Sequence, residues 1–225
     1  MQKYELEKKI WTEADFHKMG WHDNHIYKTR LTEDLEFDLD YILQWNEPEV
    51  EGLPFSFWLA PSTLVFRQIK NLQFEIDTAF NEAIEIEDIE LTTVENENHW
   101  TIVTHQGNLE FISEGFTQYI RQKPFFEFGQ TISYIERNGF SLDRTTEQNN
   151  PNRFESDLLE QRKKDLEHYE NAKKRQLKRH EKESLKQARD SGKIKLKDYL
   201  IKKREIKEML DLYDYWLKET KFENW

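Results

Sequence analysis

The first candidates for chemistry are three histidines and one aspartate that lie within nine positions near the N-terminus. His17 precedes the run Met19-Gly20-Trp21-His22-Asp23-Asn24-His25. Imidazole nitrogens and carboxylate oxygens are ligands for zinc and iron. The spacing is unfavourable, because neighbours such as His22 and Asp23 face opposite ways in an extended strand. A metal-dependent enzyme using His22, Asp23 and His25 is therefore the least favoured interpretation, and a structural turn between a helix and the first strand is the favoured one.

No other motif of the sequence indicates catalysis. It contains no serine or cysteine nucleophile signature and no phosphate-binding glycine loop, so a non-catalytic protein is favoured over an enzyme, and no cofactor is expected. The chain has 0 cysteines, which excludes disulfides and thiolate metal sites and fits a reducing compartment. It has neither a run of about 18 apolar residues nor a signal-type N-terminus. We expect a bacterial cytoplasmic protein that does not bind membranes.

Charge divides the chain near Pro151. Residues 1–150 carry 12 Lys+Arg and 28 Asp+Glu, a net charge of −16, whereas residues 151–225 carry 21 and 16, a net charge of +5. Together they give the −11 of the whole chain. Opposite net charges in two parts of a chain give information about its binding partners and not about its fold. We predict an acidic β domain over 1–142, a polar linker over 143–152 and a basic helical arm over 153–225.

Alternation of apolar and acidic residues predicts strands in the first part, most clearly over 35–41. The stretch 13–19 is predicted to be a short helix, with Thr12 as its N-cap and Asp15 at N3. Further strands are predicted over 55–58, 64–66, 72–77, 84–87, 100–104, 109–112 and 116–120, with 55–58 and 64–66 separated at Pro61. The connections are too short for crossover helices, which indicates an antiparallel sandwich or curved sheet.

Helix-forming residues dominate after the linker. Residues 153–189 contain no Gly or Pro, Asp190-Ser191-Gly192 supplies a stop, and 194–220 carry an apolar stripe. The fold class is therefore α+β, with a C-terminal α-helical hairpin. The first helix has a thin apolar seam, which is typical of an antiparallel coiled-coil arm. We expect this seam to consist of Leu158, Leu159, Leu166, Tyr169 and Leu177.

Two charged surfaces are the candidate binding sites. The first is an acidic face of the sheet, because the acidic members of each alternating stretch point away from the apolar side. Its predicted residues are Glu36, Asp38, Asp40, Glu75, Asp77, Glu85 and Glu87. The second is the basic arm, whose predicted residues are Lys163, Lys164, Lys173, Lys174, Arg175, Lys178, Arg179, Lys202, Lys203 and Arg204. The favoured interpretation of this acidic face is an ordinary solvated surface. The alternatives are a docking surface for a basic partner or for the protein's own basic arm, and a divalent-metal site.

Four sequence motifs indicate where the first part of the chain comes from, but not what it does. The motifs WHDN (21–24), FDLDYI (37–42), APSTLVF (60–66) and QYIRQKP (118–124) occur in this order. With them, residues 10–140 resemble a family of small uncharacterised bacterial proteins. The resemblance implies a domain boundary and no assigned activity, and the arm lies outside it.

Two kinds of function remain in addition to the metal enzyme. The favoured one is a non-catalytic protein-binding protein, in the manner of an immunity protein or a complex subunit. Its partner would be another protein or, through the arm, a second copy of the chain. The alternative is binding of the nucleic-acid backbone by the basic arm, which would weaken steeply with salt.

Overall fold

The computed structural model describes residues 4–77, 83–148 and 155–225. The chain forms two compact units. The sheet unit comprises Met1–Asn46 and Phe55–Pro151, and the helical unit comprises Glu47–Pro54 and Asn152–Trp225. Residues 47–54, which connect two strands along the chain, therefore belong with the helices.

The order of elements confirms the α+β class and the helical hairpin. Within the described residues, no helix is long and apolar enough to cross a membrane. The elements of the sheet unit are β1 (Ile10–Thr12), η1 (Glu13–Lys18), β2 (Asn24–Leu31), β3 (Leu35–Asn46), β4 (Ser56–Arg67), β5 (Lys70–Ile76), β6 (Ile84–Val94), β7 (Glu97–Thr104), β8 (Gly107–Ile112), β9 (Gly115–Ile120) and β10 (Phe125–Glu127). Those of the helical unit are α1 (Glu155–Asp190) and α2 (Leu196–Leu217).

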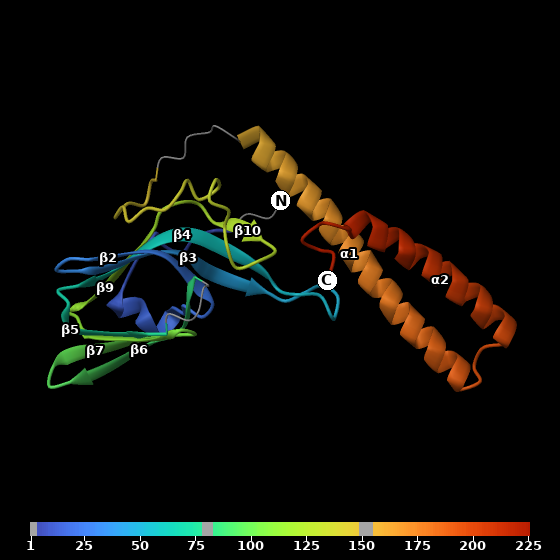
Figure 1. Ribbon diagram of the computed structural model, residues 1–225, viewed down its shortest axis with the longest axis horizontal. Helices are drawn as coiled ribbons and strands as arrows, with labels where there is room; N and C mark the ends of the chain where they lie inside the picture. Colours follow the sequence, from blue (N-terminus) through green and yellow to red (C-terminus); the bar gives the residue numbers. More distant parts are fainter. Residues whose placement is uncertain (1–3, 78–82, 149–154) are drawn as a thin grey trace. The chain divides into compact units, whose positions relative to one another are not determined.

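The ten strands form one antiparallel sheet, as the short connections predict. Nine of them follow the order β1-β9-β4-β3-β2-β6-β7-β8-β5, and β10 pairs with β4. The sheet is curved, so that β3 and β4 lie in one layer and β6 and β7 in another, with η1 in the opening between them (Figure 1). This arrangement buries one face of each layer in a shared core.

Aromatic side chains fill this core. Phe66 on β4 packs against Trp100 on β7 and Phe111 on β8, with ring centroids 5.1 and 4.9 Å apart. Phe16 of η1 reaches between the layers and meets the Trp100 ring edge to face at 5.4 Å. Such large rings contribute much of the apolar area that folding removes from water. The predicted cap of η1 is present, since the Thr12 N–H donates to Asp15 Oδ2 at 3.0 Å.

The predicted break at Pro61 is wrong, because β4 runs unbroken through this residue. The N–H and C=O of one residue in an antiparallel strand point to the same neighbour. The Pro61 carbonyl accepts from the Arg121 N–H at 2.9 Å, so its nitrogen also faces that side. There β9 has ended at Ile120 and β10 begins only at Phe125. The missing proline N–H therefore costs no strand pairing.

The strand β6 is longer than the predicted 84–87, because it forms a hairpin with β7. β6 extends to Val94 and turns into β7 through Glu95 and Asn96, whose φ angles are 51° and 67°. Two successive positive φ values are typical of a type I′ turn, which matches the twist of the flanking strands. The sequence did not predict this turn, because Glu95 and Asn96 stand where type I′ turns usually have Asn-Gly or Asp-Gly.

An irregular segment covers the other face of β3 and β4. Residues 121–148 run along the side of these strands that faces away from β6 and β7 (Figure 1). A second small apolar cluster forms there from Ile42, Phe57, Leu59 and Ile132, with Phe125 against it. β3 is therefore covered on both faces. Of the predicted linker 143–152, residues 143–148 belong to this segment, and 149–152 lie outside the described residues.

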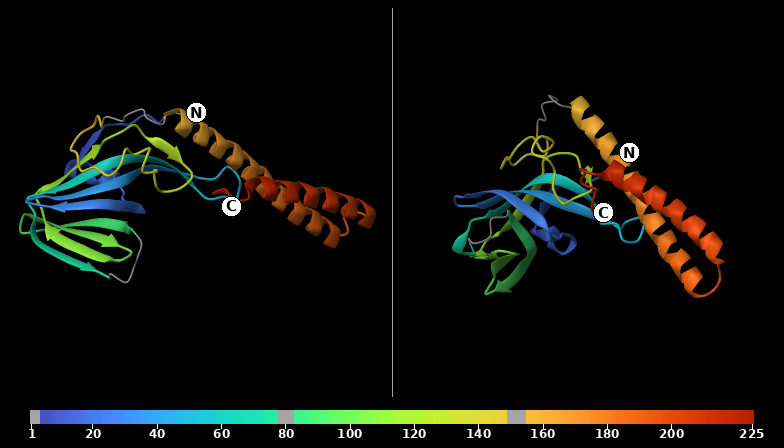
Figure 2. Two further views of the ribbon diagram at one scale, coloured as in Figure 1. Left: turned by 45° about the horizontal axis from the view of Figure 1, so that its top comes forward. Right: turned by 45° about the vertical axis from the view of Figure 1, so that its right-hand side comes forward.

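In the helical unit, α1 and α2 run side by side in opposite directions (Figure 2). Near the turn between them, Leu185 of α1 packs with Tyr199 and Ile206 of α2. The predicted α1 seam is wrong for Leu159, Leu166 and Leu177, which are exposed, and right for Tyr169, which is buried. Hydrogen bonds from Arg175 to Asp214 and from Arg189 to the Tyr199 hydroxyl also join the two helices.

Two other parts of the helical unit pack on α1. Lys173 Nζ lies 2.7 Å from Glu49 Oε2, and Gln176 Nε2 donates to the Glu51 carbonyl at 3.2 Å. After α2 the chain turns back, and Phe222 packs beside Tyr169 and Trp225. The helical unit thus consists of the hairpin, the 47–54 segment and the C-terminal turn.

Candidate functional site

The predicted acidic face begins with the carboxylates of β3. Asp34, Glu36, Asp38 and Asp40 share one side of β3 and the turn before it, and we call them the β3 carboxylate row. The prediction of an exposed face is wrong here: Glu36 has 1% of its surface exposed, and Asp38 and Asp40 have 0%. Alternation does point these side chains away from the aromatic core. The segment 121–148 covers that side and supplies arginines to it.

Asp38 is fully buried and is bound by two buried arginines. Its Oδ1 accepts hydrogen bonds from Arg121 Nη2 at 2.6 Å and Arg137 Nη2 at 2.5 Å. Its Oδ2 accepts from the Ser141 N–H at 3.0 Å. Arg121 and Arg137 also have 0% of their surface exposed. A buried carboxylate with these partners holds the covering segment in place, because losing either arginine would leave charge without compensation.

Glu36 and Asp34 are held by arginines nearer the surface. Arg30 donates to Glu36 from Nε at 3.0 Å and Nη2 at 2.6 Å, and Arg144 Nη2 bridges Glu36 and Asp34 at 3.1 and 2.6 Å. Burial alone would raise the pKa of Glu36. The hydrogen bonds from Arg30 and Arg144 outweigh burial and lower the pKa of this carboxyl below its usual value.

Asp40 has a different environment. Its Oδ2 accepts from the Tyr27 hydroxyl at 2.9 Å and the Ile132 N–H at 2.7 Å, and Arg137 lies 3.6 Å from Oδ1. Burial raises the pKa of Asp40 despite these partners. Burial also raises the pKa of Tyr27, as does the nearby Asp40, so the phenol keeps its proton as a donor. The four carboxylates of the row thus face four arginines, and the row acts as a structural clamp.

The other predicted acidic residues do not join the β3 row. Glu75 on β5, Asp77 after it and Glu87 on β6 are exposed, and Glu85 on β6 is half-buried. β7 and β8 lie between β5 and β6 in the sheet. The seven predicted residues therefore do not form one acidic face.

The predicted basic arm is partly neutralised within the helical unit. Arg175 is buried, and its guanidinium donates to Asp214 Oδ1 at 2.9 Å. Its Nη2 also donates to the main-chain carbonyls of Phe222, Glu223 and Trp225 at 2.8, 2.9 and 2.7 Å. This arginine anchors the C-terminal turn and is inaccessible to a partner, so its prediction as a binding residue is wrong. A long basic side chain looks the same in sequence whether it is buried or exposed.

The remaining basic residues fall into two groups. Several are in ion pairs, namely Lys164 with Glu160, Lys173 with Glu49 and Glu170, Lys178 with Glu181, and Arg204 with Glu208. Arg179 donates to the Trp225 carbonyl at 2.9 Å. The side chains of Lys163, Lys174, Lys202 and Lys203 are exposed. The arm therefore offers less free positive charge than its composition indicates.

His22 and Asp23 lie in a turn directly before β2, as the favoured interpretation of the sequence predicts, and His22 Nε2 lies 3.3 Å from Asp23 Oδ1. His22 Nδ1 lies 2.9 Å from the Glu87 carbonyl, and His25 Nε2 lies 3.5 Å from Glu85 Oε2. The hydrogen bond to Glu87 raises the pKa of His22. Among the described residues, the group whose ligand atoms lie close enough for one metal ion is Asp23, Glu85 and His105. Of these three, the sequence predicts Asp23 as a metal ligand and Glu85 as part of the acidic face, and His105 was not predicted, because nothing local in the sequence connects residues 23, 85 and 105.

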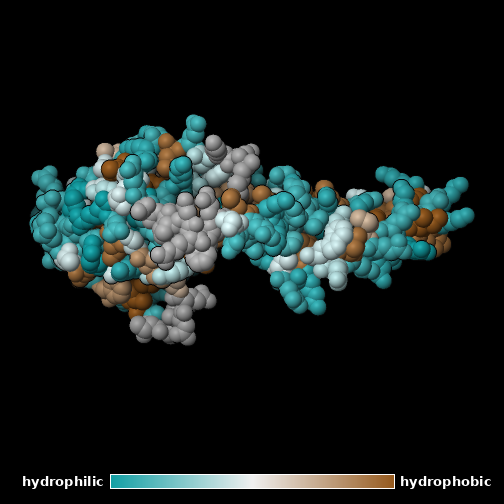
Figure 3. All heavy atoms as spheres, turned by 90° about the horizontal axis from the view of Figure 1, so that it is seen from above, coloured by the Kyte–Doolittle hydropathy of each residue, from teal (hydrophilic) through white to brown (hydrophobic). Residues whose placement is uncertain are grey.

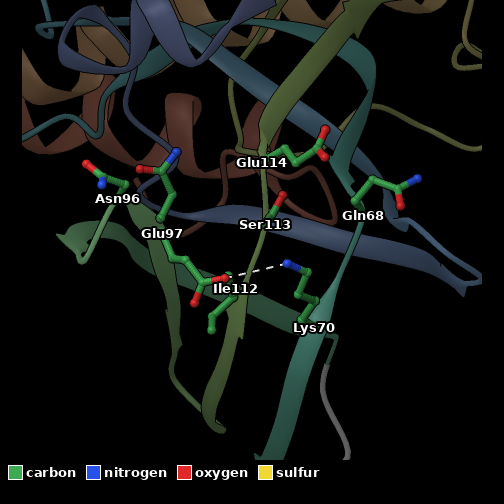
Figure 4. A pocket seen from close by; sticks show the side chains of 8 residues that line it. Gln68, Lys70, Asn96, Glu97, Ile112, Ser113 and Glu114 are labelled. Carbon is green, nitrogen blue, oxygen red and sulfur yellow. Dashed lines mark hydrogen bonds and ion pairs between the residues drawn. The ribbon is translucent and has the colours of Figure 1, made fainter.

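A polar hollow lies where β4 leads into β5, beside the β7 and β8 ends (Figure 4). Lys70 Nζ and Glu97 Oε1 face each other across it at 3.5 Å. The Ser113 hydroxyl donates to the Arg67 carbonyl at 2.7 Å, so it stabilises the chain rather than serving as a nucleophile. The hollow thus shows no arrangement that would activate a substrate. Its lining residues are Gln68, Lys70, Asn96, Glu97, Asn98, Ile112, Ser113 and Glu114.

Large apolar side chains remain exposed on the hairpin. They appear among hydrophilic atoms along the helices (Figure 3). Tyr215 is the most exposed of them, at 76%. The exposed apolar residues of α1 are Leu159, Leu166 and Leu177, and those of α2 are Leu196, Leu200, Ile201, Leu212, Tyr215 and Trp216. Exposed apolar residues that gather on one face of an element are typical of an interaction site.

Fold and surface together define an α+β protein whose β3 carboxylate row is internal and whose helical hairpin, like the sheet unit, has exposed large apolar side chains. No family model matches the chain, and neither a curated protein nor a solved structure matches it.

Proposed function

We propose that this chain is a non-catalytic interaction protein that binds a second copy of itself through the outer face of α2. The observation that supports this is a set of exposed apolar residues on α2 opposite an already filled seam. Tyr199, Ile206, Tyr213 and Leu217 are buried. Ile201 and Leu212 are exposed and lie three helical turns apart on another face, with Tyr215 one turn beyond. A cytoplasmic location belongs to the same proposal, supported by the lack of cysteine.

Charge along α2 favours a second copy as the partner. Residues 196–204 carry four bases and one acid, a net +3, whereas 205–217 carry four acids and one base, a net −3. This distribution is opposite to the one that a helix dipole stabilises. In an antiparallel pair of α2 helices, each basic half would lie against the acidic half of its partner. A two-fold symmetric contact of this kind is self-complementary and closed, and would complete a four-helix bundle.

Exposed apolar groups favour a protein partner over nucleic acid. Phosphate binding needs free cations, whereas Arg175 is buried and Lys164, Lys173, Lys178 and Arg204 are already in ion pairs. Nucleic-acid binding by the exposed lysines remains the second candidate. It would depend on Lys202 and Lys203, and Leu212 would play no part.

Sedimentation equilibrium over a range of protein concentrations tests the proposal on the full chain. We expect a reversible monomer–dimer equilibrium that Leu212→Glu shifts at least tenfold toward monomer, because a charge would then be buried in the contact. Leu177→Glu is the matched control, since it places the same charge at an exposed leucine of α1 and should leave the dimer unchanged.

Two results would contradict the proposal. One is a wild-type chain that stays monomeric at every concentration. The other is a dimer that Leu177→Glu disrupts as strongly as Leu212→Glu. Fluorescence anisotropy with single-stranded and double-stranded nucleic acid of random sequence, at low and high salt, tests the second candidate function. Binding that Lys202→Ala weakens and Leu212→Glu does not would favour it.

A further inference from the structure

We infer that Asp23, Glu85 and His105 form a binding site for a divalent transition-metal ion. Each residue presents a ligand atom, and these atoms all lie within 4.8 Å of one another. The site lies in the sheet unit, and the inference is independent of the proposed self-association.

The main chain brings the three side chains together. Asp23 is in the turn before β2, Glu85 is on β6 and His105 is between β7 and β8. The Asp23 N–H donates to the Ile86 carbonyl at 2.8 Å, and the His105 N–H donates to the Glu85 carbonyl at 3.1 Å. Both ligand-bearing turns are therefore hydrogen-bonded to β6 beside Glu85. Little conformational entropy would be lost when an ion binds to groups that are already held in place.

Neighbouring side chains orient the two carboxylates. Gln130 Nε2 donates to Asp23 Oδ2 at 2.5 Å. His25 Nε2 lies 3.5 Å from Glu85 Oε2. Ligating carboxylates in metal sites are themselves hydrogen-bonded by such outer groups, and these partners affect affinity. Gln130 and His25 are thus placed as positioning residues for Asp23 and Glu85.

The donor set indicates the class of ion. One imidazole with two carboxylates suits zinc, iron and manganese better than calcium or magnesium, which prefer oxygen ligands alone. Each carboxylate also has a histidine beside it, since His22 Nε2 lies 3.3 Å from Asp23 Oδ1 and His25 Nε2 lies 3.5 Å from Glu85 Oε2. The Asp23 and Glu85 side chains are 16% and 24% exposed, and His105 is exposed, so water can reach the site. Three protein ligands would leave a further position for a water molecule.

Isothermal titration of the full, untagged and EDTA-treated chain with Zn²⁺ tests this inference. We expect binding of one ion per chain, and an affinity at least tenfold lower in Asp23→Asn and in His105→Ala. Asparagine tolerates the Asp23 φ of 62° and keeps the shape of the side chain. His17→Ala, which removes an exposed imidazole outside the cluster, is the matched control and should bind as the wild type does.

A second measurement identifies the ligands. The visible absorption of bound Co²⁺ reports its coordination, and we expect it to change in His105→Ala and to stay unchanged in His17→Ala. Circular dichroism shows whether each variant is folded. The inference is overturned if the chain binds no stoichiometric Zn²⁺, if folded Asp23→Asn and His105→Ala bind it as the wild type does, or if Ca²⁺ or Mg²⁺ binds more tightly than Zn²⁺.

Discussion

Arg121 donates from Nη2 to Asp38 Oδ1 at 2.6 Å, and neither side chain is exposed to solvent. The two residues lie 83 positions apart in the sequence. Their contact joins β3 to the segment that follows β9. The pair therefore closes the sheet unit on the side away from its aromatic core.

Removal of Arg121 should destabilise the sheet unit strongly. Arg121→Met would leave Asp38 with only Arg137 as a charged partner, and breaking a buried ion pair on one side costs about 3–5 kcal/mol. Urea unfolding followed by tryptophan fluorescence measures this change. Arg30→Met is the matched control, because the Arg30 side chain is 50% exposed and its pair with Glu36 should contribute about 1 kcal/mol or less. Equal losses in both variants would contradict the structural role of Arg121.

Asp40 should make stability depend on pH in the direction opposite to that of Glu36. Burial raises the pKa of Asp40 in the folded state, so its contribution is fully present below the unfolded pKa of about 4 and is lost as pH rises through the folded pKa. Asp40→Asn cannot ionise. Its urea midpoint relative to the wild type should therefore rise as pH increases above about 4. A relative midpoint that falls over this range would show that Asp40 is stabilised as a carboxylate.

Arg175 should be required to hold the C-terminal turn on α1. Arg175→Met removes the bond to Asp214 and three bonds to main-chain carbonyls, and leaves these acceptors partly unpaired. We expect a loss of about 2–4 kcal/mol in the helical unit and faster proteolysis after residue 217. Thermal circular dichroism and limited proteolysis measure the two effects. Lys174→Met, at the exposed neighbouring position, should change neither, and an equal effect there would contradict the prediction.

Gly107 should not tolerate a side chain. Its φ is +139°, and a Cβ there would lie 2.0 Å from the Glu75 carbonyl oxygen across the β5–β8 pair. Gly107→Ala should therefore lower stability by about 2 kcal/mol or more and disturb the pairing of β5 with β8. Gly20→Ala is the control, since no atom lies within 4 Å of the corresponding Cβ. Urea midpoints compare the two, and a Gly107→Ala variant as stable as Gly20→Ala would refute the argument.

The strands were predictable where apolar and polar residues alternate, because one face of such a strand packs in the aromatic core. The alternation over 35–41 gives β3 its correct inner face, since period two and an apolar core are local properties. The cover on its outer face was not predictable, because residues 121–148 have no periodicity. Asp is unfavourable in strands, so Asp38 and Asp40 within one strand were the signal that could have indicated buried pairing with arginine.

The sites required distances that a sequence does not contain. Lys174 and Arg175 are neighbours of similar type, yet one is exposed and the other is buried under the C-terminal turn. His105 joins Asp23 only through the pairing of β2, β6 and β7. The hairpin itself was predictable, because helix-forming residues, a stop at Gly192 and an apolar stripe are all local.

The assignment of Glu47–Pro54 to the helical unit bears on how this protein could have been assembled. The chain passes between the two units three times, after residues 46, 54 and 151. A gene fusion at a single boundary would add α1 and α2 without the segment that pairs with Lys173 and Gln176. A hairpin transferred without residues 47–54 would leave Lys173 without Glu49 and Gln176 without the Glu51 carbonyl. The segment 47–54 and the helices are therefore expected to be exchangeable only as one unit.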